Sequence, residues 1–270
     1  MAAAGYEPRM GHWRWRVAAV LAPSLPLFAW VAWMSPLAQN PQYHDFADQR
    51  RLVGVPHFWN VMSNLPFAVI GLLGCWWLMQ ARRTSRAFAT PTERIAYFVF
   101  FLGELLTCFG SGYYHAAPTN ETLVWDRLVF SLMLTSFFAI VWTEFVSLRV
   151  GRLILAPWVL LGIYSVLHWG WTEAAGRGDL RLYALVQFYP VIAVPFIVLL
   201  FRSRYTFAGT WLLTWALYGV AKGCEAYDAP IYELTGGFWS GHTLKHLIAA
   251  GASYLPLYSL RHRQVRTPGG

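Results

Sequence analysis

Three histidines, one aspartate and one serine of this sequence could together do metal-assisted chemistry. They are His115, His242, His246, Asp126 and Ser111. His242 lies four residues before His246, and Ser111 lies four residues before His115. In a helix this offset places both side chains of each pair on one face. Neutral imidazole is the commonest metal ligand, and a catalytic zinc keeps three protein ligands and leaves its fourth position to water. The set therefore has the ligands that a zinc site needs.

Long apolar segments must position these residues. Of the 270 residues, 57% are hydrophobic and 13% are charged, whereas globular proteins are about half apolar and about a quarter charged. Crossing the hydrocarbon core of a membrane takes roughly 20 mostly apolar residues per helix. We predict an all-α polytopic membrane protein whose spans lie at residues 13–34, 58–79, 93–114, 124–145, 153–171, 182–201, 210–224 and 241–260.

The charged residues predict the orientation of these spans. Basic side chains gather at both termini and on alternate loops, which the positive-inside rule places in the cytoplasm, so the number of spans is even. The net charge of +8 therefore reflects topology and requires no nucleic-acid partner. The basic groups are Arg9, Arg14, Arg16, Arg82, Arg83, Arg86, Arg94, Arg149, Arg152, Arg202, Arg204, Arg261, Arg263 and Arg266, and the outward acids are Asp45, Asp48, Glu121, Asp126, Glu173, Asp179, Glu225, Asp228 and Glu233.

This topology brings the reactive residues to one face of the membrane. His115 ends an outward-going span, Asp126 begins the next inward-going span, and the pair of His242 and His246 begins the last one. We assign the three histidines to zinc and expect Asp126 to hydrogen-bond the metal-bound water, as general base and then general acid. Direct coordination by Asp126 is the alternative. A single interfacial histidine is usually only hydrogen-bonded, but three at one depth beside an acid favour a metal.

Two further ionisable residues lie in predicted spans, where such groups are costly and usually functional. His168, near the outward end of the fifth span, could join the site. Glu104 precedes His115 by eleven residues, which places it about 16 Å deeper in a helix, so it cannot reach the metal. We expect Glu104 to face the bundle interior and pair with a polar neighbour, or to line a proton path or a lipid cavity.

Four segments carry a resemblance to a known family. They are Phe-Trp-Asn continuing to Ser-Asn-Leu-Pro-Phe at residues 58–67, Gly-Ser running to His at 110–115, Asp126, and the histidine pair continuing into Gly-Ala-Ser-Tyr-Leu at 242–255. In order and spacing they resemble the alkaline ceramidase family, within the wider group of seven-helix membrane hydrolases that includes the adiponectin receptors. The resemblance covers residues from about 45 to 260.

The resemblance implies a seven-helix transmembrane bundle, residues 41–260, with zinc held by the three histidines and Asp126 beside the metal-bound water. It also implies that Ser111 stabilises the oxyanion. A nucleophilic Ser111 is disfavoured, because no histidine would be free to act as its base. Residues 1–40 then form an N-terminal tail and one extra N-terminal transmembrane helix, and residues 261–270 form a basic cytoplasmic tail.

A calcium site is a point of departure from the family. Alkaline ceramidases carry an acidic calcium-binding segment before the first core helix, with a glutamate directly before Phe-Trp-Asn, and here that position is His57. Asp45 and Asp48 could be remnants of this segment. Arg50 and Arg51 follow closely, however, and oppose a cation that prefers several oxygen ligands. We therefore disfavour calcium and interpret the acids as a solvated loop.

These observations predict a zinc-dependent intramembrane lipid amide hydrolase. By the resemblance it would cleave a ceramide-like sphingolipid to a fatty acid and a sphingoid base, at an active site that faces a periplasm or an organelle lumen. Two alternatives remain: a hydrolase of another acyl amide or ester lipid, and a receptor or scaffold that binds zinc and lipid without turnover. Four protein ligands with no open position would favour the receptor. A transporter is disfavoured because no broken helix pair or inverted repeat is visible.

Overall fold

The computed structural model describes residues 10–80 and 86–266. Of the predicted basic groups, Arg9, Arg82 and Arg83 lie outside these residues. The described part of the chain is built from helices and contains no β-strand beyond two isolated bridges. The helices are α1 Met10–Leu21, α2 Ser24–Trp33, α3 Phe58–Met62, α4 Leu65–Met79, α6 Glu93–Ala116, α7 Asn120–Phe145, α8 Leu148–Ala174, α9 Arg181–Leu200, α10 Gly209–Ala226, α11 Asp228–Leu234 and α12 Gly241–His262, with a 3-10 turn at Pro41–His44.

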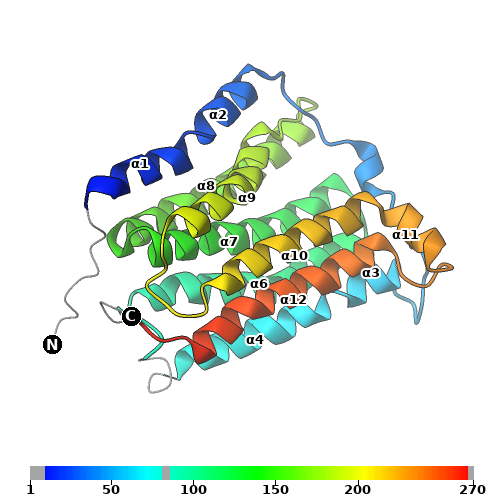
Figure 1. Cartoon of the computed structure of the whole chain (residues 1–270). Coiled ribbons are helices and arrows are strands. Elements are labelled where there is room, and N and C mark those ends of the chain that lie inside the picture. Colours follow the sequence, from blue (N-terminus) through cyan, green and yellow to red (C-terminus); the bar gives the residue numbers. More distant parts are fainter. Residues whose placement is uncertain (1–9, 81–85, 267–270) are drawn as a thin grey trace.

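The helices form an all-α polytopic bundle, as predicted (Figure 1). Six described segments are long and apolar enough to cross a membrane: Trp13–Trp33, Phe58–Met79, Glu93–Ala116, Asn120–Phe145, Leu148–Ala174 and Arg181–Leu200. The last two predicted spans, α10 and α12, pack against each other within the bundle. They are more polar because they carry Lys222, Glu225, His242, Lys245 and His246.

Two of the predicted spans are interrupted. The first divides into α1 and α2 at Pro23, which has no N–H to continue the helix. The second divides into α3 and α4 at Ser63 and Asn64, with Pro66 in the first turn of α4, where a missing N–H is tolerated. The second break places the Ser63 side chain against His246.

A tight turn joins α6 to α7. The Thr119 hydroxyl accepts a hydrogen bond from Thr122 N (3.3 Å), and the Thr122 hydroxyl accepts one from Thr119 N (3.1 Å), which forms a capping box. The cap starts α7 four residues before the predicted boundary. His115 in the last turn of α6 and Asp126 in the second turn of α7 therefore lie at the same end of two neighbouring helices.

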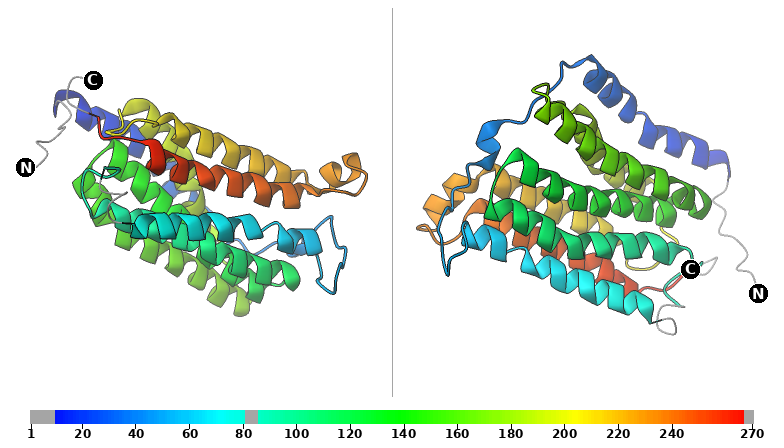
Figure 2. Two further views of the ribbon diagram at one scale, coloured as in Figure 1. Left: turned by 90° about the horizontal axis from the view of Figure 1, so that it is seen from below. Right: turned by 180° about the vertical axis from the view of Figure 1, so that it is seen from behind.

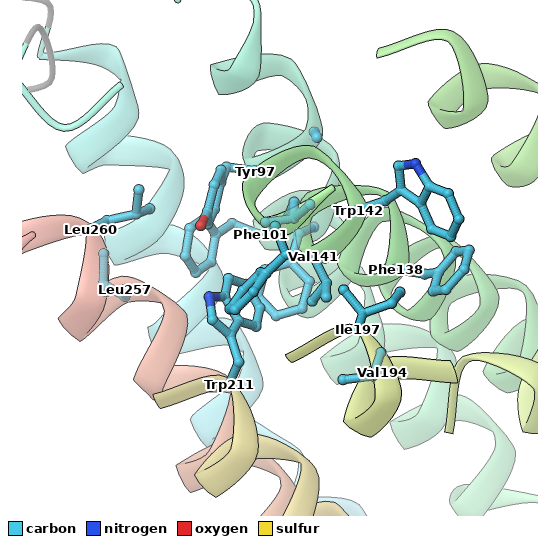
Figure 3. Close-up of a cluster of buried hydrophobic side chains, with 14 of the residues drawn as sticks. Tyr97, Phe101, Phe138, Val141, Trp142, Val194, Ile197, Trp211, Leu257 and Leu260 are labelled. Atoms are coloured by element: carbon cyan, nitrogen blue, oxygen red, sulfur yellow. The ribbon is translucent and has the colours of Figure 1, made fainter. Parts of the chain in front are cut away.

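The main apolar core lies toward the other end of the bundle, where Tyr97, Phe101, Trp211, Leu257 and Leu260 pack together (Figure 3). The two additional views show α12 between α10 and α4 along its length (Figure 2). The end of α12 lies at the same end of the bundle as the start of α1, and the three histidines lie at the opposite end (Figure 1).

A buried ion pair joins the helices at this core end. Arg263 and Glu144 are 4% and 2% exposed and contact each other directly. Tyr97 donates to Glu144 Oε1 (2.5 Å) and Trp211 Nε1 donates to Glu144 Oε2 (3.0 Å). Arg263, which the sequence places in a basic tail, is thus an internal cation that holds the end of α12 against α6 and α7.

Replacing Glu144 should destabilise the protein strongly. Glu144→Ala leaves the Arg263 charge buried without a counter-charge, which costs about 3–5 kcal/mol. We expect a large fall in the thermal unfolding midpoint in detergent, and no comparable fall for Glu233→Ala, because Glu233 is exposed. The double variant Glu144→Met with Arg263→Met should recover most of the loss. Equal unfolding midpoints for Glu144→Ala and Glu233→Ala would contradict a stabilising role of the ion pair.

Candidate metal centre

Three imidazoles from α6 and α12 converge at the end of the bundle. His115, His242 and His246 are 1%, 4% and 4% exposed. One ring nitrogen of each lies within 4.8 Å of the others, and His115 Nε2 lies 3.2 Å from His242 Nε2. Two nitrogens bound to a tetrahedral zinc at its usual bond length lie roughly 3.3 Å apart. The predicted ligands therefore form a group with the donor type and spacing of a metal site.

The start of α12 fixes two of these ligands. Ser240 Oγ accepts a hydrogen bond from Thr243 N (3.0 Å) and caps the helix directly before His242. A Cβ atom at Gly241 would lie 2.1 Å from Cys224 O, so α12 approaches α10 more closely than any other residue would allow. The cap and the close approach set the rotation of α12 that turns His242 and His246 inward.

A serine at the break between α3 and α4 orients His246. Ser63 Oγ donates to Asn60 O (3.2 Å) and lies 2.8 Å from His246 Nδ1. Because the hydroxyl proton is used toward Asn60, the oxygen accepts the N–H of Nδ1, and the lone pair of His246 is then on Nε2. A metal-binding histidine normally has such a partner on its second nitrogen. Sequence reasoning gave Ser63 no role.

His57 supports His115 from the first loop. Its Nδ1 donates to the backbone oxygen of His115 (3.0 Å), and its φ of 44° is in the left-handed region that non-glycine residues rarely adopt. This position is where the alkaline ceramidases carry a glutamate. In this chain His57 contacts the turn of α6 that carries His115. Like the contact of Ser63, this contact was not predicted from the sequence.

Phe46 covers the histidines from the loop that precedes α3. Its ring centroid lies 4.8 Å from that of His115 and 4.5 Å from that of His242. Asp228 holds this cover in place, because Oδ2 accepts from Ala47 N (2.9 Å) while Oδ1 accepts from His242 N (2.7 Å). The loop and the start of α12 thus share one carboxylate, and an apolar ring shields two of the imidazoles from solvent.

A cavity of about 370 Å³, lined by both polar and apolar side chains, opens beside His246. His246, Asp126 and Ser111 all line it, and the Asp126 carboxylate interacts with the Ser111 hydroxyl. Asp126 is not among the residues whose ligand atoms lie within 4.8 Å of one another. The structure therefore brings the predicted aspartate and serine together on the cavity wall next to the metal-capable group.

An apolar pocket of about 90 Å³ adjoins the cavity. The two spaces share Phe67, Thr107, Phe130, Tyr218 and Ala249 in their walls. Glu104 lines the apolar pocket, is fully buried, and has no hydrogen-bond partner among the described residues. Ser253 lies beside it but donates to Ala250 O (2.8 Å). The position of Glu104 beside Ser253 on the pocket wall is compatible with both the expected polar pairing and the lipid-cavity alternative.

The other candidate ligands lie apart from the three histidines. His168 is outside the group, and its Nδ1 is buried without a partner among the described residues. Asp45 is exposed. Asp48 is buried and binds Arg50 with both carboxylate oxygens, to Nε at 2.8 Å and to Nη2 at 2.7 Å. The arginine thus occupies the oxygens that a calcium ion would require.

Sequence reasoning missed a set of cations around the cavity. Lys245 Nζ lies 2.9 Å from His242 Nε2 and 2.9 Å from Glu225 Oε1, and Lys222 contacts Glu225 as well. Arg127 directly follows Asp126 and also lines the cavity. A signal was present, because all of these are ionisable residues inside or at the ends of predicted spans.

Zinc content should depend on the three histidines. We expect about one zinc per chain in the purified protein, and a loss of most of it in His242→Ala, because two imidazoles hold zinc far more weakly than three. His168→Ala is the matched control and should keep its zinc. Elemental analysis of both variants makes the comparison. Equal zinc contents would rule out His242 as a ligand.

Ser63 should tune metal affinity without being a ligand. Ser63→Ala removes the hydrogen bond that fixes the His246 ring, and losing such a partner typically weakens metal binding about 10- to 100-fold. The control is Ser165→Ala, a buried serine of α8 whose hydroxyl donates within its own helix to Gly162 O. Competition with a zinc-binding dye measures the affinity, and the same affinity in both variants would contradict this role.

Comparisons with known proteins give no match. No protein-family model matches the chain, and no curated protein matches it. The chemistry proposed below is therefore supported by the residues of this chain and by the motif resemblance alone.

Proposed function

We propose that this protein is a zinc-dependent intramembrane hydrolase that cleaves the amide bond of a ceramide-like lipid to a fatty acid and a sphingoid-type amine. One observation carries the proposal. Three buried imidazoles whose ligand atoms lie within 4.8 Å of one another adjoin, through His246, a cavity that holds Asp126 and Ser111. An acid, a hydroxyl and a metal-capable group on one cavity are the parts that metal-assisted acyl transfer needs.

His115, His242 and His246 would hold the zinc. A zinc ion bound there supplies Lewis acidity toward the carbonyl and lowers the pKa of a coordinated water. Asp126 takes the proton of the attacking water and returns it to the nitrogen as the C–N bond breaks, so that the products are a carboxylic acid and an amine. The Ser111 hydroxyl is hydrogen-bonded to Asp126, and once Asp126 has taken the proton, Ser111 would donate instead to the oxygen that becomes negative during attack.

The number of ligands favours catalysis over a structural role. A structural zinc is closed by four protein ligands, whereas a catalytic zinc has three and an open position. The described group contains three residues, and Asp126 is outside it. This count supports a hydrolase rather than a zinc-stabilised receptor or scaffold.

The substrate class is supported by the shape of the site. The polar cavity meets the apolar pocket through a shared wall, and an acyl chain in the pocket would place its amide in the cavity. We propose that the cavity faces a periplasm or an organelle lumen and that both termini are cytoplasmic. The charge distribution of the loops supports this orientation.

Turnover of an amide lipid tests the function. With purified, zinc-loaded protein we expect a ceramide-like amide to be cleaved, and Asp126→Asn to lower kcat about 10²- to 10⁴-fold, because general acid–base catalysis contributes that much. Zinc content is measured in parallel and should not change. The control is Asp45→Asn, an exposed acid of the first loop, which should retain full activity.

Three outcomes would change or exclude the proposal. An Asp126→Asn variant with unchanged turnover would exclude the assigned mechanism. Absence of turnover across a panel of matched amide and ester lipids, with zinc and lipid both bound, would favour the receptor. Preferential cleavage of the ester would keep the mechanism and change the substrate.

A further inference from the structure

Arg127, on the cavity wall, has one guanidinium nitrogen without a hydrogen-bond partner among the described residues. The side chain is 5% exposed and lines the cavity wall. Its Nη2 donates to Gln39 Oε1 (2.6 Å), but its buried Nη1 has no partner among the described residues. A buried, unpaired guanidinium nitrogen is costly, because desolvation is not offset by a hydrogen bond. A group that is absent from the chain itself would satisfy it.

Aromatic rings hold this guanidinium in place. Its central carbon lies 4.0 Å from the ring centroid of Trp169 and 4.8 Å from that of Tyr183. The nearby Glu173 is already hydrogen-bonded, since Oε2 accepts from Trp169 Nε1 (3.0 Å) and from Gln39 N (3.1 Å). Stacking and the Gln39 bond fix the Arg127 plane, so Nη1 is a pre-oriented donor.

The charges on the cavity wall leave an excess of positive charge. The cations are Arg127, Lys222 and Lys245, and the anions are Asp126 and Glu225. Glu225 is shared by both lysines, with Lys245 Nζ at 2.9 Å. One carboxylate thus serves two ammonium groups, and a zinc ion at the histidines would add further positive charge. A neutral ligand would leave this excess uncompensated in a site of low dielectric.

We propose that the cavity recognises an anionic head group, of the phosphate class, on the lipid amide, with Arg127 as its principal donor and Lys222 and Lys245 as supporting charges. Guanidinium and ammonium groups bind phosphate oxygens through charge-assisted hydrogen bonds. This inference rests on the proposed function and narrows its substrate from a neutral ceramide-like lipid to an anionic one. Arg127 is a binding and specificity residue and takes no part in bond cleavage.

Equilibrium binding tests the head group without turnover. Zinc-free protein in nanodiscs of neutral lipid is titrated with three competitors of equal chain length against a fluorescent acyl lipid. They are the neutral amide lipid, its phosphate monoester and the free fatty acid. We expect the wild type to bind the phosphate lipid about ten-fold or more tightly than the neutral lipid, because a hydrogen bond to a charged group contributes that much.

The variants assign the preference to Arg127. Arg127→Gln should abolish most of the preference for phosphate and leave the affinity for the neutral lipid unchanged. Lys222→Gln should reduce the preference less, since Lys245 and Glu225 remain paired. The control is Arg152→Gln, an exposed arginine at the start of α8 that does not line the cavity, and it should behave as the wild type.

Each outcome decides a separate question. Equal wild-type affinities for the two amide lipids would overturn the inference, as would an Arg127→Gln variant that weakens both equally, which a purely structural arginine predicts. Arg127-dependent binding of the free fatty acid, with no gain from phosphate, would assign the cations to the carboxylate product and overturn the head-group assignment. Arg127-dependent phosphate binding without any hydrolysis by zinc-loaded protein would support the inference and reject the proposed function. Hydrolysis of both amide lipids at equal rates, with equal binding, would support the proposed function and overturn the inference about the head group.

Discussion

The approach of α6 and α12 at one end of the bundle is the constraint on which the site depends. His115 Nε2 and His242 Nε2 lie 3.2 Å apart, and contacts at both ends of α12 hold that helix in place. At the site end, Gly241 packs against the backbone of α10, and Asp228 ties the start of α12 to the loop that carries Phe46. At the other end, the pair of Arg263 and Glu144 holds α12 to α7. Small residues at helix contacts and internally paired polar groups are what membrane helices use in place of the hydrophobic effect.

The buried charged and polar groups have different surroundings at the two ends of the bundle. Glu144 accepts hydrogen bonds from Tyr97 and Trp211 in addition to its contact with Arg263, so its charge is compensated, while Arg263 Nη2 is buried without a partner among the described residues. At the end that carries the histidines, several buried polar groups also lack partners in the described part of the chain. His115 Nδ1 and Arg127 Nη1 lack partners among the described residues, and two lysines share Glu225. Unsatisfied buried polar groups are rare in folded proteins and concentrate where a ligand or an ion completes them. The histidine end differs from the core end in having three imidazoles whose ligand atoms lie close together beside a cavity, and this is the basis for proposing function there.

The polar cavity and the apolar pocket together explain why the site belongs in a membrane. Phe67 and Phe130 belong to both walls, so the apolar pocket lies directly beside the polar groups of the cavity. Lys245 adds a link between the two functions of the cavity. Its ammonium contacts both His242 Nε2 and Glu225, and a metal at His242 would leave it bonded to Glu225 alone. Metal binding and charge in the cavity are thereby coupled through one side chain.

The sequence by itself determined the apolar spans and the residues that could bind a metal, because both depend on local composition and helical spacing. The predicted boundaries of α6, α9 and α12 lie within two residues of the observed ones, and the offset of four placed His242 and His246 on one face. Tertiary structure alone decided which groups surround that face. Ser63 reaches His246 because the span breaks before Pro66. Arg127 of α7 contacts Gln39 of the first loop, Trp169 of α8 and Tyr183 of α9. Arg263 is an internal cation because its partner Glu144 comes from a distant part of the chain. In the low dielectric of the interior a charge depends on such partners, and a local sequence pattern does not show them.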